Sequence, residues 1–179
     1  MNALLALSRF IDALNERVGR AAFWLVLAAT LVSAGNASFR YVFGTSSNAW
    51  LELQWYLFAG IFLLAAGYTL KHNGHVRIDV FHARFSPRLR AWVDLVGGLL
   101  FLLPMSGLIL WLSWPMFLGS WRLNETSADA GGLLRWPVKL LIPTGFLLLT
   151  LQGVSEVIKR AAFLTGEAPL TEETAEETV

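Results

Sequence analysis

Along the chain, long runs of apolar residues alternate with short polar segments. Each run is close to or above the roughly 20 residues that an α-helix needs to cross a bilayer. Pro104 and Pro115 lie in the third run, where neighbouring helices can re-satisfy the freed backbone groups. Lys139 in the fourth run can extend its charged end to the membrane surface. The pattern predicts an all-α membrane protein with four transmembrane helices, at about residues 21–43, 50–70, 87–118 and 137–160.

Residues 1–20 precede the first span and have apolar and polar positions at helical spacing. We expect an amphipathic helix that lies at the membrane interface. A secretory signal peptide with residues 21–34 as its apolar region is the alternative. Twenty mixed-charge residues before that region and the lack of a small-x-small cleavage site argue against it. The apolar side holds Leu4, Leu7, Ile11, Leu14 and Val18, and the opposite side holds Ser8, Asp12, Asn15 and Glu16.

Local signals mark further boundaries of the predicted membrane domain, residues 21–163. Gly44 is expected to end the first span, since glycine breaks helices. Ser86 can accept hydrogen bonds from free backbone amides and Pro87 fits the first helical position, so the third span is predicted to start there. Residues 164–179 are acidic and have no apolar period, which predicts a disordered tail.

The composition agrees with folding in a membrane. Hydrophobic residues make up 55% of the chain and charged residues 15%, whereas soluble domains have about 25% charged residues. The mean hydropathy is +0.54. The chain has no cysteine, which excludes disulfides, thiolate metal sites, iron–sulfur clusters and a cysteine nucleophile.

The basic residues are distributed unevenly between the two sides of the predicted bundle. Because Lys and Arg are retained in the cytoplasm, the richer side is expected to be cytoplasmic, with both termini on it. The connections on the other side are too short to form a separate domain there. The richer side holds Arg9, Arg17, Arg20, Lys71, Arg77, Arg84, Arg88, Arg90, Lys159 and Arg160, and the poorer side holds Arg40, Arg122, Arg135 and Lys139.

Two opposite charges lie near the predicted outer membrane surface, on helices that a short turn joins. Arg40 ends the first span and Glu52 begins the second, so we expect them to pair. The pair could be an ion or substrate site, because charges at membrane depth are usually functional. A structural latch is favoured, since one charge pair is too little polar surface for a pathway. The first helical turn also favours an anion at Glu52.

Two further residues in the predicted spans are candidates for function. Asp94 lies about two turns inside the third span and could be a coupling-ion ligand. With Arg88 and Arg90 nearby, a structural acid that reaches the cytoplasmic surface is the favoured interpretation. Trp50 lies near a helix end, as expected for an interfacial anchor.

All three histidines lie in one predicted cytoplasmic connection. Axial haem ligands would have to face each other inside the bundle, so haem is not expected. His75 and Asp79 are four positions apart and could share a metal, but no third ligand is defined; a hydrogen bond that fixes the connection is favoured. We therefore predict no metal and no cofactor.

Several short motifs occur in a distinctive order. They are Arg40-Tyr-Val-Phe-Gly, Trp50-Leu-Glu, a helix ending near Lys71, Gly74-His-Val-Arg-Ile-Asp, Trp136-Pro and Ile142-Pro-Thr-Gly. Together with four spans, their order resembles the small membrane subunit of tripartite ATP-independent periplasmic (TRAP) transporters. The resemblance covers nearly all of residues 4–160. The acidic tail is outside it.

The resemblance implies a non-enzymatic subunit of an ion-gradient-driven symporter for organic acids, in the cytoplasmic membrane of a bacterium or archaeon. Its implied partners are a large multispanning permease subunit, a periplasmic substrate-binding protein and membrane lipid, with no nucleic acid. The small subunit would brace the large one and assist docking of the binding protein. The expected assembly or partner contacts are Arg40, Trp50, Glu52, His75, Asp79 and Asp94.

Two other classes remain as alternatives. One is the membrane anchor of a respiratory enzyme, which the lack of histidine inside the predicted spans opposes. The other is a self-contained small oligomeric exporter with Glu52 as its coupling acid. Flux through the isolated chain would favour the exporter, and a haem absorption band would favour the anchor.

Overall fold

A computed structural model describes residues 2–74, 85–167 and 169 of the chain. The regular secondary-structure elements in this part are all helices. Four helices are long and apolar enough to cross a membrane, which confirms the all-α prediction. The third of them is one continuous helix made of α4, a π-helical segment η1, and α5. The elements are α1 (Asn2–Phe43), α2 (Asn48–Lys71), α4 (Pro87–Gly97), η1 (Gly98–Leu102), α5 (Leu103–Arg122) and α6 (Trp136–Leu164).

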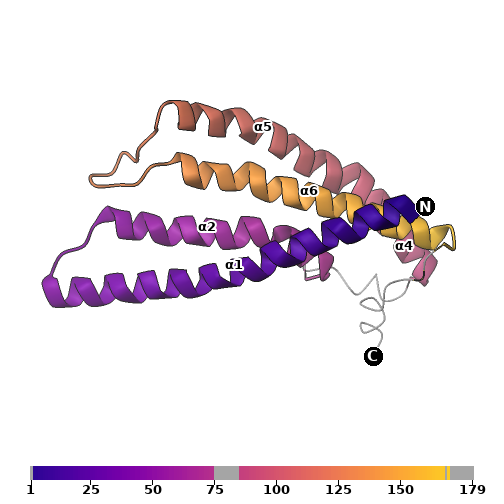
Figure 1. Ribbon diagram of the computed structural model, residues 1–179, viewed down its shortest axis with the longest axis horizontal. Coiled ribbons are helices and arrows are strands. Elements are labelled where there is room, and N and C mark those ends of the chain that lie inside the picture. The colour runs from indigo at the N-terminus through magenta and orange to yellow at the C-terminus, as the bar shows by residue number, and fades with distance from the viewer. Residues whose placement is uncertain (1, 75–84, 168, 170–179) are drawn as a thin grey trace.

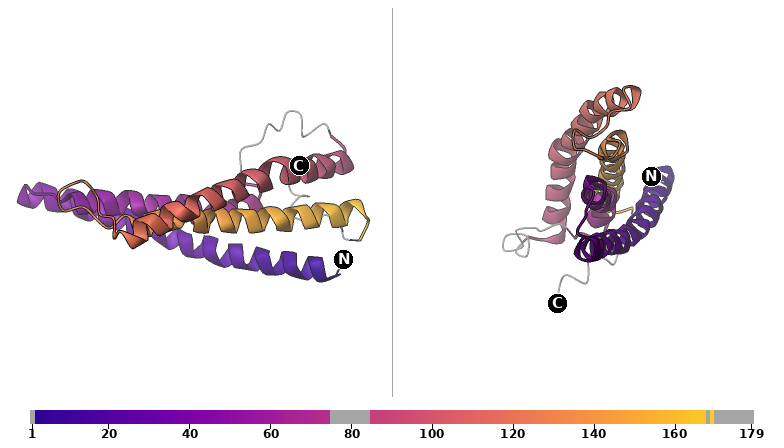
Figure 2. Two further views of the ribbon diagram at one scale, coloured as in Figure 1. Left: turned by 90° about the horizontal axis from the view of Figure 1, so that it is seen from above. Right: turned by 90° about the vertical axis from the view of Figure 1, so that its left-hand side faces the viewer.

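The helices form an elongated bundle with α6 at its centre (Figure 1). α6 contacts α1, α2, α4 and α5. The α1–α2 turn and the loop between α5 and α6 lie at one end, here called the loop end, and the N-terminus lies at the other, here called the N-terminal end. Seen from above, α6 lies between α4 and the N-terminal half of α1 (Figure 2).

The helix has no break at the expected boundary between residues 1–20 and the first span, because α1 is continuous from Asn2 to Phe43. At 1.5 Å per residue, this helix is about 63 Å long, roughly twice the hydrocarbon thickness of a bilayer. Part of α1 must therefore lie outside the hydrocarbon core. That residues 1–20 lie at the membrane interface stays a prediction.

The two sides of residues 1–20 also differ from the expectation. The polar residues Ser8 and Asn15 are buried against α6, whereas Leu4 and Leu7 are about half exposed. The physical reason is that α6 presents polar residues to α1, so the polar side of α1 faces another polar helix side instead of water. The apolar residue Ile11 is also buried, between Ser8 one turn before it and Asn15 one turn after it.

The first predicted helix end is confirmed. α1 ends at Phe43, and Gly44 has a φ of +65°, a conformation that glycine adopts without strain. The Asn36 side chain already accepts a hydrogen bond of 3.1 Å from Ser46 in the turn. The last turns of α1 therefore extend beyond the start of α2, as Figure 1 shows.

The third span begins as predicted, with the Ser86 hydroxyl accepting from the Leu89 amide at 3.4 Å and Pro87 in the first helical turn. The π segment at residues 98–102 was not predicted. The Leu103 amide donates to the Gly98 carbonyl, five residues earlier. Pro104 follows at once, and its ring would clash with the carbonyl four residues back in a regular α-helix. The wider π turn relieves that clash.

Small residues allow α6 to pack closely against its neighbours. Ser106, Ser113 and Ser120 of α5 are buried at seven-residue intervals, and the Thr150 hydroxyl of α6 donates to Ser106 at 3.0 Å. On the α2 side, a Cβ at Gly145 would come within 2.6 Å of the Leu63 carbonyl oxygen. The fourth span thus follows the prediction for residues 137–160, with one more turn at its end. Most of the predicted acidic tail lies outside the described residues.

Candidate functional site

Glu52 anchors the loop between α5 and α6, and we call this contact the loop clasp. The side chain is 2% exposed. Its carboxylate accepts hydrogen bonds from the Ser127 hydroxyl and, at 2.6 Å, from the Leu133 backbone N–H. A carboxylate that accepts from such donors forms short, charge-assisted hydrogen bonds. The first turns of α2 therefore hold a loop that is distant in sequence.

Other side chains of α2 extend the loop clasp. Asn48 and Tyr56 donate to the carbonyls of Ala130 and Leu134, each at 3.1 Å. Arg135 at the end of the loop places its guanidinium 6.0 Å from the Trp55 ring centroid. These contacts attach one side of the loop to α2.

The loop has its own short-range order. Thr126 and Leu134 form an isolated antiparallel bridge, and the Ser127 amide donates to the Leu133 carbonyl at 2.9 Å. A Cβ at Gly132 would lie 2.9 Å from Glu52 Oε1 and 2.4 Å from the Ser127 Cβ. Glycine is thus required where the loop passes over Glu52.

The expected Arg40–Glu52 pair is wrong. Among the described residues, Glu52 takes its partners from the loop, and Arg40 is exposed with no ion pair to it. The reason is geometric: Asn36 already contacts Ser46 in the turn before α2, and Arg40 lies one helical turn further along α1. Trp50 is 43% exposed, consistent with an anchor at a helix end.

Glu125 forms a second anchor at the loop end, through an ion pair with Lys139 of α6. This hydrogen bond from the Lys139 ammonium is the main cause that holds the pKa of Glu125 below its usual value. The Lys139 ammonium thus reaches out of the fourth span, as predicted, and binds a residue of the loop. Glu125 and Lys139 fix the start of α6 to the end of α5.

Asp94 lies against α6, where it forms a contact between helices. Its carboxylate lies 3.3 Å from the guanidinium of Arg160, which is 9% exposed. The pair joins α4 to α6 at the N-terminal end. His75 and Asp79 lie outside the described residues.

A cluster of polar side chains between α1 and α6 was not predicted, and we call it the α1–α6 polar cluster. Asn15 and Gln152 are fully buried, and Asn15 donates to the Gln152 side-chain oxygen at 3.0 Å. Gln152 in turn donates to Asp12 at 2.8 Å and to Glu156 at 3.1 Å. The remaining members are Ser8, Ser155 and Lys159, with Ser155 donating to Asp12 at 2.7 Å and Lys159 paired to Asp12 and Glu156.

This cluster continues to α2 through a close approach of backbone. A Cβ at Gly67 would lie only 2.1 Å from Asn15 Oδ1 and 3.2 Å from the Leu148 carbonyl oxygen. Asn15 Oδ1 has no conventional hydrogen-bond partner among the described residues. The oxygen fills the space that the absent side chain of Gly67 leaves, so α1, α2 and α6 meet at this point.

Glu16 joins α1 to the end of α2. Its carboxylate lies 2.8 Å from the Lys71 ammonium and 2.9 Å from His72 Nε2. Arg20, one turn further along α1, pairs with the same carboxylate at 2.8 Å. For the α1–α6 polar cluster a sequence signal was present, because polar positions recur at three- and four-residue spacing on both α1 and α6.

The arrangement is suited to holding helices and a loop together. The inward-facing polar groups described above are bound to other helices or to the loop. Within residues 2–74, 85–167 and 169, no group of three His, Asp or Glu residues is placed to hold a metal ion. These contacts hold the helices and the loop of this chain together.

In a comparison with protein-family models, residues 29–163 match the DctQ component of tripartite ATP-independent periplasmic transporters. Comparisons with curated proteins and with solved structures return no match. The matched region includes the C-terminal third of α1, all of α2, α4, η1 and α5, and all but the last residue of α6, so it reaches all four apolar helices. The chain therefore belongs to the DctQ family, the small permease component of TRAP transporters.

Proposed function

We propose that this subunit braces the large permease subunit of an ion-gradient-driven TRAP transporter for organic acids. It would lie in the cytoplasmic membrane with both termini inside and would assist docking of the periplasmic substrate-binding protein. Membership of the DctQ family supports the proposal that this chain is part of such a complex. The bracing role, the substrate class and the orientation are our inferences.

The observation that carries the bracing role is the division of polar and apolar surface. The polar groups of the spans are used between helices, in the loop clasp and the α1–α6 polar cluster. The outer surface of the third span is apolar instead, and suits lipid or a partner helix better than a hydrophilic path. Its large exposed residues are Leu100, Phe101, Met105, Leu108, Trp111 and Leu112.

A reconstitution experiment tests this role. The chain alone, the large subunit alone, and both together are placed in liposomes, with the binding protein and a sodium gradient supplied from outside. We expect uptake of an organic acid only with both subunits. Flux through the isolated chain would contradict the proposal and support the exporter alternative.

The proposed orientation has a separate test. A reporter fused after Val179 should be cytoplasmic, and a reporter inserted near Asp129 in the loop should be periplasmic, because Lys and Arg favour the cytoplasmic side. The opposite result at either position would reject the orientation but leave the family assignment intact.

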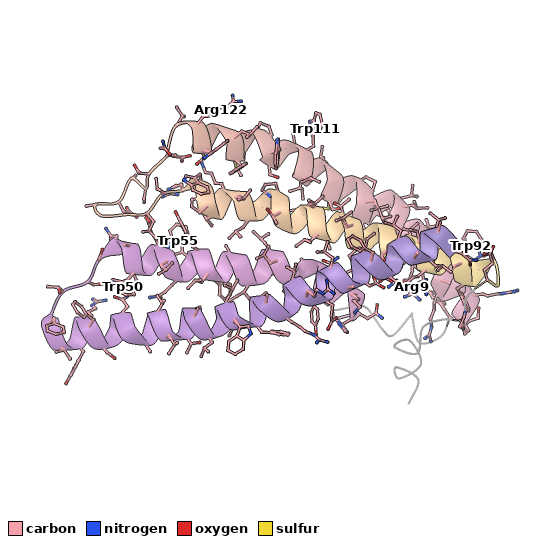
Figure 3. The ribbon with its side chains drawn as sticks, in the orientation of Figure 1. Arg9, Trp50, Trp55, Trp92, Trp111 and Arg122 are labelled. Atoms are coloured by element: carbon pink, nitrogen blue, oxygen red, sulfur yellow. The ribbon has the colours of Figure 1, made fainter. Side chains whose placement is uncertain are left out.

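Docking of the binding protein is proposed at the loop end. Asp129 and Ala130 are exposed in a loop that Glu52 holds in place, so the loop can present a fixed surface. A photo-crosslinking group at Asp129 should capture the binding protein when the whole complex is present. The same group at Trp92, an exposed residue at the opposite end, is the control (Figure 3). Equal capture at both positions would reject docking at this loop.

A further inference from the structure

The N-terminal half of α1 presents three arginines on its outward side. Arg9 and Arg20 are eleven positions apart, about three helical turns, so they lie on the same side of the helix. Arg17 lies about 60–80° around the helix from them, still away from the buried side, and all three side chains are exposed. The buried residues Ser8, Asn15 and Gly19 occupy the opposite side.

The charges at this end are not balanced within the described part of the chain. Asp12, Glu16, Asp94 and Glu156 each pair with a basic residue from another turn or helix. Arg9 and Arg17 have no ion pair among the described residues. The outward side of α1 therefore carries positive charge that the acids of the bundle do not neutralise.

The surroundings of these arginines place them at the depth of lipid headgroups. Arg20 directly precedes the apolar run that begins at Ala21, and Trp24, one turn later on the same side, is 69% exposed. Tryptophan and arginine together at the end of an apolar run are typical of the membrane–water interface. Phe10, the next residue after Arg9, is 67% exposed, as expected of a helix that borders acyl chains.

We propose that the outward side of α1, through Arg9, Arg17 and Arg20, binds the phosphate groups of anionic phospholipids. Guanidinium groups bind phosphate oxygens in pairs. Arg9 and Arg17 have no ion pair among the described residues and Arg20 shares Glu16 with Lys71, so the net positive charge of this side prefers anionic over zwitterionic headgroups. The exposed apolar residues beside them favour lipid over an acidic protein surface as the occupant. The site is independent of the proposed transport role, and the proposed orientation makes it a cytoplasmic-leaflet site.

Native mass spectrometry of the purified full chain tests the site. The chain is equilibrated in micelles with equal amounts of dioleoyl phosphatidylglycerol and dioleoyl phosphatidylcholine, and the retained lipids are counted. We expect the phosphatidylglycerol preference to fall by about fivefold for each arginine removed in Arg9→Gln and Arg17→Gln, singly and together. Arg9→Lys with Arg17→Lys keeps the charge and should retain most of the preference.

The matched control removes two exposed arginines at the opposite end. Figure 3 shows Arg9 and Arg122 at opposite ends of the bundle. Arg40→Gln with Arg122→Gln changes the net charge equally and should leave the preference unchanged. An equal loss in this control, or no loss in the Arg9 and Arg17 pair, overturns the proposal.

Two further measurements complete the test. For the unmodified chain, the preference should weaken with added salt, because exposed charges are screened; a salt-independent preference overturns the proposal. The Arg9 and Arg17 pair is also copurified with the large subunit. Normal lipid preference together with lost copurification would assign this side of α1 to the protein partner and reject the lipid site.

Discussion

Glu52 and Leu133 are 81 positions apart in the chain, yet the Leu133 backbone N–H donates to the Glu52 carboxylate at 2.6 Å. The loop between α5 and α6 is thus shaped by a residue of α2. Since the same carboxylate also accepts from Ser127, two points of the loop depend on one side chain.

Replacing Glu52 should loosen the loop. Hydrogen bonds to a charged group contribute about 1.5–3 kcal/mol each, so Glu52→Ala is expected to destabilise the loop end by a few kcal/mol. Hydrogen exchange of the Ser127 and Leu133 amides should accelerate, while amides of α6 near Gln152 should not change. Unaltered exchange at Leu133 would contradict the loop clasp.

Arg40 provides a sharp comparison with the ion pair expected from sequence. Because Arg40 does not contact Glu52, Arg40→Gln should neither mimic Glu52→Gln nor restore stability when combined with it. The yield of the complex with the large subunit is the measurement. A double variant that recovers the yield lost by Glu52→Gln would show that the two charges pair in the assembled transporter.

Gly67→Ala should destabilise the junction of α1, α2 and α6. The added methyl group would overlap Asn15 Oδ1, and overpacking of this kind typically costs about 1–3 kcal/mol. Gly107→Ala is the control, since a Cβ there meets nothing within 4 Å and alanine favours a helix. Thermal unfolding in detergent should separate the two variants; equal melting temperatures would argue against the close approach at Gly67.

Lys159→Met should destabilise the α1–α6 polar cluster. The change leaves Asp12 and Glu156 without their shared cation, at a cost of about 1–3 kcal/mol, below the 3–5 kcal/mol of a fully buried pair because both side chains are partly exposed. Combining it with Asp12→Asn should cost less than the sum of the single changes. Arg88→Met, at an exposed position of α4, is the control for loss of a positive charge. Additive effects would indicate that Lys159 and Asp12 act independently.

Glu125 should titrate at lower pH than an ordinary glutamate, whose pKa is near 4.5. Its folded pKa is lowered by Lys139, so its contribution to stability is complete above the unfolded pKa and is lost as pH falls through the folded pKa. Lys139→Met should raise the pKa of Glu125 toward its ordinary value, measured by carboxyl ¹³C NMR. Lys159→Met, at the other end, should not; a shift in both variants would contradict a local cause.

The sequence was sufficient for the spans and for the helix ends with local signals. Apolar length determines the spans, and Gly44, Ser86 and Pro87 act on their own backbone, so no tertiary information was needed. The partners of Glu52 could not be predicted. They depend on how the loop returns over α2, which no local pattern encodes.

The α1–α6 polar cluster was missed for a different reason. Helical spacing shows that Ser8, Asp12 and Asn15 share a side of α1, but it does not show what covers that side. Water and a second polar helix side give the same pattern. The complementary spacing of Gln152, Ser155 and Glu156 on α6 was the available signal, and the two patterns had to be compared with each other.

The π segment at residues 98–102 allows both halves of the third span, α4 and α5, to contact α6. Asp94 and Ser106 both face α6 and are twelve positions apart, whereas three regular α-helical turns would supply about eleven. The extra residue corrects the phase of the helix between its two halves. A one-residue deletion there would leave eleven positions between Asp94 and Ser106, which a regular α-helix keeps on the same side. Regular α-helical geometry with all residues present would instead rotate α5 by about 100° relative to α4 and turn the serine side of α5 toward the lipid. The segment thus controls the direction of the serine side of α5 through its backbone alone, since none of its side chains is buried.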